Sequence, residues 1–80
     1  MSYSESERKL ANFFVEREGE GVLDVLKDVN LVSEGYLDSL DMVVLAVYIE
    51  EQFNVKLDLV SEETFHAVQD FNSLHKLVSS

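Results

Sequence analysis

Cysteine and proline are both absent from the 80 residues of this chain, and glycine occurs only three times. Without cysteine there is no disulfide and no thiolate metal site, so any thiol chemistry requires a group attached to the protein. Without proline, and with so little glycine, few positions force a helix to end. These absences favour a helical fold and exclude a small disulfide-stapled scaffold.

Basic side chains are also scarce, because six lysines and arginines face 16 aspartates and glutamates and leave a net charge of −10. Such a surface repels nucleic acid phosphates and anionic lipid head groups, so we expect neither as a partner. An acidic surface suits instead a protein that docks on basic patches of other proteins.

Long apolar runs are missing as well. None is long enough to span a bilayer, and the N-terminus lacks the basic-then-apolar pattern of a signal peptide, so we expect a cytoplasmic protein without membrane insertion. His66 and His75 are too far apart in sequence to be two ligands on one helix face, and the acids lack the spacing of a calcium loop. The sequence therefore predicts no metal site.

The chain does contain enough apolar residues, 46% of the total, to build one hydrophobic core. A domain of this size has one core at most. We therefore expect residues 1–80 to form a single domain and the protein to be a monomer.

The spacing of the apolar residues predicts a first helix over residues 3–18, capped by Ser4 or Ser6 and ended by Gly19. In residues 21–37 the apolar side chains fit no single period. We interpret this segment as a long, partly buried loop that contains one short helical turn.

The clearest helix is predicted to begin after Asp38, which can cap it, and to run to about residue 53, where Asn54 is a plausible stop. Residues 55–60 are predicted as an extended connector, and Ser61 as the cap of one short helical turn. A last helix is marked by Val68, Phe71, Leu74, Leu77 and Val78. The predicted fold class is all-α, with three longer helices, a short one, and a long loop between the first and second.

The second predicted helix carries more apolar side chains than one buried stripe requires. Its core stripe is predicted to be Met42, Leu45, Ile49 and Phe53. The remaining apolar residues are Leu40, Val43, Val44, Val47 and Tyr48. They are either buried by a surrounding bundle or form a docking surface or pocket wall. Residues 34–63 also hold eight of the acids and a single lysine, which places an acidic rim around this helix.

Residues 35–41, Gly-Tyr-Leu-Asp-Ser-Leu-Asp, resemble the acyl carrier and peptidyl (aminoacyl) carrier protein family. The modified serine of that family lies in an Asp-Ser-Leu motif at the start of the second helix, which here is Asp38-Ser39-Leu40. The resemblance extends over residues 10–78, because the helix end at residues 49–53 and the short third helix at residues 63–65 follow at the family's spacing. The form of the motif is closer to stand-alone carriers of amino acids or specialised acyl groups.

The resemblance implies a four-helix carrier bundle that is not an enzyme. It would hold an acyl or aminoacyl group as a thioester on a 4′-phosphopantetheine arm attached covalently to Ser39, with Asp38 as the adjacent acid and cap. The implied partners are a phosphopantetheinyl transferase, an acyl- or aminoacyl-loading ligase, and downstream acyl or aminoacyl transferases of a biosynthetic pathway. The positions implied to contact partners are Leu40, Asp41, Val43, Val44, Val47, Glu50, Glu51, Glu62 and Glu63.

Two positions depart from the family's pattern. Val44 stands where many fatty-acid carriers have an acid that helps to dock partners, which implies a more apolar interface. Ala67 stands where many members have a Thr or Ser that caps the last helix, which implies a weaker cap.

The five phenylalanines are predicted to lie in the core: Phe13, Phe14, Phe53, Phe65 and Phe71. The size of any pocket between the second and third helices is predicted to depend on the packing of Val43, Leu57, Leu59 and Phe65. An acyl chain would use such a cavity, whereas a charged amino acid would stay outside it.

Two other functions remain open. The first is an unmodified acidic helical adaptor that binds a protein partner through the second helix, and replacement of Ser39 separates it from a carrier. The second is a small acidic hydrolase or metal-binding domain, for which the sequence shows no triad or ligand spacing. The sequence leaves open whether the cargo is a fatty acyl, polyketide or amino acid group.

Overall fold

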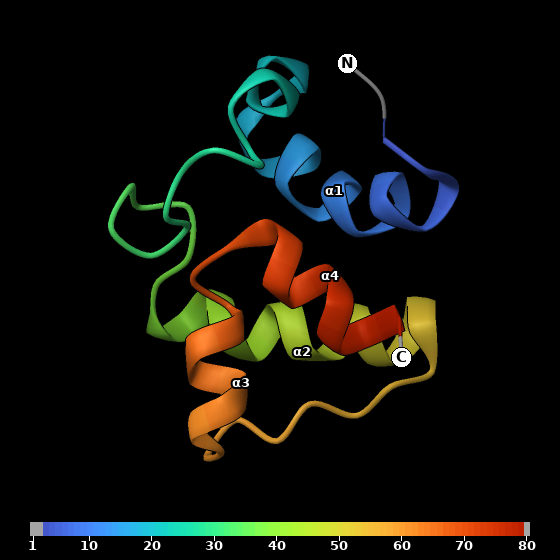
Figure 1. Ribbon diagram of the computed structural model, residues 1–80, viewed down its shortest axis with the longest axis vertical. Helices are drawn as coiled ribbons and strands as arrows, with labels where there is room; N and C mark the ends of the chain where they lie inside the picture. The colour runs from blue at the N-terminus through green and yellow to red at the C-terminus, as the bar shows by residue number, and fades with distance from the viewer. Residues whose placement is uncertain (1–2, 80) are drawn as a thin grey trace.

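The computed structural model describes residues 3–79, and within them the chain forms four α-helices, a 3₁₀ helix and no strand (Figure 1). The elements are α1 (Glu5–Glu18), η1 (Glu20–Asp24), α2 (Ser39–Phe53), α3 (Glu62–Ala67) and α4 (Phe71–Ser79). The predicted all-α class, the short third helix and the long loop before α2 are confirmed. No helix in this range is long and apolar enough to cross a membrane.

The helices begin where side chains satisfy the free N–H groups of the first turn. Ser4 accepts a hydrogen bond from the backbone N–H of Glu7, and Ser61 accepts one from the N–H of Glu63. Asn54 ends α2 in the left-handed conformation, with φ of 57°. These local signals explain why the predicted boundaries of α1, α2 and α3 are confirmed within a few residues.

The core lies between α1, α2 and α4, which pack against one another and are labelled in Figure 1. At its centre the ring of Phe14 makes edge-to-face contacts with Phe13 and Phe71, with centroid distances of 5.3 and 6.5 Å. The other fully buried large side chains are Leu10, Leu26, Leu31, Leu37, Leu45, Ile49, Leu74 and Val68.

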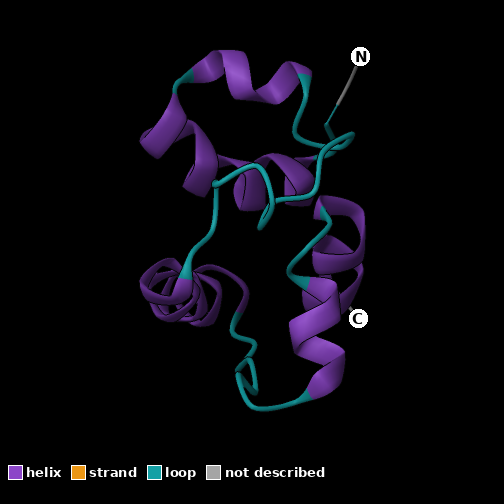
Figure 2. Cartoon of the chain, turned by 90° about the vertical axis from the view of Figure 1, so that its left-hand side faces the viewer, coloured by secondary structure: helices purple, strands orange, loops and turns teal. Residues whose placement is uncertain are grey.

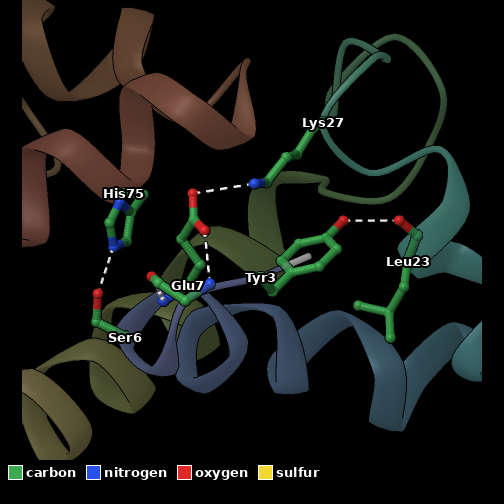
Figure 3. A network of polar contacts seen from close by, with 7 residues as sticks. Tyr3, Ser6, Glu7, Leu23, Lys27 and His75 are labelled. Carbon is green, nitrogen blue, oxygen red and sulfur yellow. Dashed lines mark hydrogen bonds and ion pairs between the residues drawn. The ribbon is translucent and has the colours of Figure 1, made fainter. Parts of the chain in front are cut away.

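The start of α1 is fastened to two other parts of the chain (Figure 3). The Tyr3 hydroxyl donates to the carbonyl of Leu23 at 2.7 Å, and the Ser6 hydroxyl lies 2.6 Å from the Nε2 atom of His75. The backbone N–H of Ser4 and the ammonium of Lys27, 3.0 Å from the carboxylate, lower the pKa of Glu7. These contacts hold the first helix against η1 and α4.

The loop between η1 and α2 is anchored to the junction of α3 and α4. The Leu31 N–H donates to the Gln69 carbonyl at 2.8 Å, and the Leu31 carbonyl accepts from the N–H groups of Tyr36 and Leu37, both at 3.0 Å. Leu31 and Leu37 are fully buried, and Gly35 turns the chain with φ of +84°. The segment that leads into α2 therefore has a fixed position relative to α3.

Two sequence predictions about this region are wrong. Phe65 is 58% exposed instead of belonging to the core, because the six-residue α3 turns its buried face, Thr64 and Ala67, inward and leaves Phe65 outside. Ala67 is the last residue of α3 and has no place at the cap of the last helix. That helix begins at Phe71, where the Asp70 carboxylate accepts the Ser73 N–H at 2.9 Å.

Candidate functional site

Ser39 is the first residue of α2, and its side chain is exposed. Within residues 3–79 its hydroxyl takes part in no hydrogen bond, whereas the hydroxyls of Ser4 and Ser61 are both used to cap helices. The Ser39 hydroxyl is therefore accessible from solvent.

The turn around Ser39 is held by a reciprocal capping box. The Asp38 carboxylate accepts the N–H of Asp41 at 2.9 Å, and the Asp41 carboxylate accepts the N–H of Asp38 at 3.1 Å. Arg17, at the end of α1, forms an ion pair with Asp41 and lies 5.2 Å from the centre of the Phe13 ring. The first turn of α2 is thus fixed both by its own side chains and by α1.

The cap also makes the first turn sensitive to acid. The pKa of the Asp38 carboxyl is held below its ordinary value of 3.8. The main cause is the hydrogen bond from the backbone N–H of Asp41, and the charge of Arg17 has a smaller effect. Because the pKa is lower in the folded state, the stabilisation is present above about pH 4 and is lost as the pH falls through the folded-state value.

We therefore predict that Asp38→Asn lowers the melting temperature at pH 7 and that the gap to the wild type narrows toward pH 3. Thermal unfolding followed by circular dichroism at both pH values measures this. The control is Asp24→Asn, which changes an exposed carboxylate in η1. An equal gap at both pH values for Asp38→Asn would contradict the role of the charged cap.

An open hollow of about 360 Å³ adjoins Ser39 between α2 and α3. Figure 2, in which α2 is seen almost end-on, shows the two helices standing apart. The lining consists of Val32, Leu37, Asp38, Ser39, Met42, Leu59, Thr64, Phe65 and Val68. Leu59 and Phe65 were predicted as wall residues and are confirmed.

Two other predicted wall residues lie elsewhere. Val43 is 54% exposed on the outer face of α2. It follows Met42 directly in the helix, and successive helical side chains point in different directions, so only Met42 lines the hollow. Leu57 packs against the hydrophobic core. Five further wall residues were not predicted from the sequence: Val32, Leu37, Met42, Thr64 and Val68. Of these, Met42 lies three residues after Ser39 on the same helix face and could have been found from spacing.

The outer face of α2 is apolar and open. Leu40, Val43, Val44 and Val47 are 78, 54, 50 and 52% exposed, and they share one side of the helix. Beside them a shallow groove of about 450 Å³ runs between α1 and α2, with Phe13 and Tyr48 in its lining. The Tyr48 hydroxyl donates to the Lys9 carbonyl at 2.6 Å, which takes Tyr48 out of the open face.

The predicted acidic rim is largely exposed. Four of its residues are exposed to solvent: Glu50, Glu51, Glu62 and Glu63. Asp41 differs, because its side chain is only 13% exposed and pairs with Arg17 and with the cap of its own helix. The structure therefore gives Asp41 partners within the chain itself.

Comparison with known families supplies the deciding observation. Residues 8–74 match the family model described as the phosphopantetheine attachment site. The chain belongs to this family. Its members carry 4′-phosphopantetheine attached covalently to a serine, so a carrier role follows for this protein. Searches of the curated proteins and of the solved structures gave no significant match.

The residues around Ser39 fit a phosphopantetheine group. The phosphodiester would be an anion at the N-terminus of a 15-residue helix, where the helix dipole favours negative charge. The neighbouring hollow is mostly apolar and open, so the aliphatic parts of an attached arm can lie against it. Ser39 also lies inside the matched residues.

Proposed function

We propose that this protein is a carrier that holds an acyl or aminoacyl group as a thioester on a 4′-phosphopantetheine arm attached to Ser39. The observation that carries the proposal is the exposed Ser39 hydroxyl at the start of a capped helix, next to an apolar hollow. The arm supplies the thiol that a chain without cysteine lacks.

The role of Ser39 is to provide the oxygen of the new phosphoester bond. Its hydroxyl oxygen would attack the phosphorus of coenzyme A that bears pantetheine. The bond from this phosphorus to the bridging pyrophosphate oxygen would break, adenosine 3′,5′-bisphosphate would leave, and the hydroxyl proton would pass to a base of the transferase. Asp38 and Asp41 hold the backbone of the turn, so that Ser39 is presented from a fixed place at the start of α2.

The lining of the hollow favours an acyl cargo over a charged amino acid. Leu37, Met42, Leu59, Phe65 and Val68 are apolar, and a charged group placed among them would lose its hydration. The one charged residue of this lining is Asp38, and its carboxylate already accepts the N–H of Asp41 in the helix cap. We therefore place acyl groups first among the cargoes, and an aminoacyl group outside the hollow.

The partner enzymes dock, in this proposal, on the outer face of α2. Leu40, Val43, Val44 and Val47 supply apolar contact, and Glu50 and Glu51 lie at the end of the same helix. This arrangement fits a partner surface with an apolar centre and basic edges. The partners are the transferase, a loading ligase and downstream transferases, and they carry out all the chemistry.

The test is loading from octanoyl-coenzyme A by a broad-specificity phosphopantetheinyl transferase with Mg²⁺, followed by intact mass. We expect the protein to gain one octanoyl-phosphopantetheine, and neutral hydroxylamine to remove the octanoyl group and leave a free thiol. If several transferases add nothing to the folded protein, the carrier proposal fails and the adaptor function, which uses the same face of α2, takes its place.

A further inference from the structure

Thr64 is the one buried polar side chain in the part of the chain that the structure describes. It is 6% exposed, and it belongs to α3, on the wall of the hollow beside Ser39. Within residues 3–79 its hydroxyl makes no hydrogen bond, although a helical threonine can bond to a carbonyl of the preceding turn.

A buried hydroxyl without a partner destabilises a protein, and native structures contain few of them. No described side-chain nitrogen or oxygen is both fully sealed and unpaired. The Thr64 oxygen is therefore not enclosed by the core, and the space open to it is the hollow. A molecule that enters the hollow meets this hydroxyl as a hydrogen-bonding group in an apolar wall.

The surroundings of Thr64 define what would fit there. Val68 and Leu37 are buried, Met42 belongs to α2 and Phe65 to α3. The other polar lining residues are Asp38 and Ser39 at the start of α2. A mainly aliphatic segment with one oxygen or N–H group satisfies both the apolar wall and the hydroxyl.

We propose that Thr64 is a binding residue of the hollow, and that its hydroxyl hydrogen-bonds a polar atom on an otherwise aliphatic segment of the group attached to Ser39. The inference rests on the proposed carrier function and deepens it. The polar atom comes either from the arm, which has amide and hydroxyl groups between aliphatic carbons, or from an oxygen on the acyl chain.

The test compares Thr64→Val, which keeps the branched shape and removes the hydroxyl, with Thr64→Ser, which keeps the hydroxyl. Each variant is studied unmodified, with the arm alone, with octanoyl, and with 3-hydroxyoctanoyl. Methyl NMR shifts of Met42, Leu37 and Val68, taken as loaded minus unmodified protein, measure how much of the group is seated in the hollow.

We expect loading to shift these methyl signals in the wild type and in Thr64→Ser. In Thr64→Val the ratio of seated to unseated group should fall roughly five-fold, as the loss of one hydrogen bond predicts. The unmodified Thr64→Val protein should have nearly the stability of the wild type, because the hydroxyl bonds no other described residue and opens onto the hollow. A purely structural role for Thr64 would instead make Thr64→Val clearly less stable.

Each form of the protein distinguishes one explanation from another. A loss of seating in Thr64→Val with the arm alone assigns the polar atom to the arm, and a loss that is seen only with 3-hydroxyoctanoyl assigns it to the acyl chain. Loading without any shift in the hollow, or equal seating in Thr64→Val and wild type, overturns the inference and leaves the carrier function intact. Failure to load Ser39 at all overturns both proposals.

Discussion

Replacement of Ser39 by alanine is expected to abolish loading by phosphopantetheinyl transferases completely while the protein stays folded. The hydroxyl oxygen is the atom that forms the phosphoester bond, and alanine offers no nucleophile in its place. The Ser39 side chain is exposed and makes no hydrogen bond within residues 3–79, so we expect the free energy of unfolding to change by about 0.5 kcal/mol or less. Intact mass after loading and urea unfolding of the variant measure the two effects.

The matched control is Ser61→Ala, which should show the reverse pattern. Ser61 caps α3 through the N–H of Glu63, so its loss should cost about 1 kcal/mol of stability and leave loading intact. If Ser39→Ala still gains the arm, or if Ser61→Ala cannot be loaded although it is folded, the assignment of the attachment serine is wrong.

The second large effect is expected for Phe14→Ala, which should remove most of the free energy of unfolding at 25 °C. Phe14 is fully buried and contacts Phe13 and, in α4, Phe71. Removal of a buried phenylalanine side chain costs about 3–5 kcal/mol. Small domains have total stabilities near the lower end of about 5–15 kcal/mol. Circular dichroism during urea unfolding checks the loss.

Phe65→Ala is the control for this prediction, because it removes the same side chain from a position that is 58% exposed. We expect its stability to lie within about 0.5 kcal/mol of the wild type. Equal destabilisation by Phe14→Ala and Phe65→Ala would contradict the described core and would indicate that Phe65 is buried in it.

The parts of the fold that could be predicted from the sequence are those with local causes. Ser4, Asp38 and Ser61 cap helices through N–H groups only two or three residues away, and Asn54 ends α2 through its own backbone conformation. Such signals are complete within one turn of the chain. For this reason the start of α2, and Ser39 with it, is visible in the sequence.

The parts that could not be predicted depend on contacts between distant segments. Gln69 accepts the N–H of Leu31, and this bond fixes the loop before α2 against the α3–α4 junction. Arg17 reaches Asp41 from another helix. Neither the Leu31–Gln69 pair nor the Arg17–Asp41 pair is indicated by spacing or residue type. From the sequence, Asp41 was therefore predicted to contact a partner protein, and no ion pair was predicted for Arg17.

The hollow shows the same limit of sequence reasoning. Phe65 reads as a core residue because its side chain is large and apolar, but a helix of six residues buries only a narrow face. Val43 and Met42 are adjacent and both apolar, and only the direction of α2 places Met42 toward α3. The residue types predict that the wall of the hollow is apolar, but the direction of each helix decides which apolar residues line it.

The measurement that tests the central claim most directly is localisation of the attached group in the wild-type protein. The chain is loaded from coenzyme A, cleaved with a protease, and its peptides are fragmented in a mass spectrometer. We predict one phosphopantetheine per chain, carried by the fragment ion that contains Ser39. A group on Ser33, Ser61 or Ser73, or no group on the folded protein, would contradict the account.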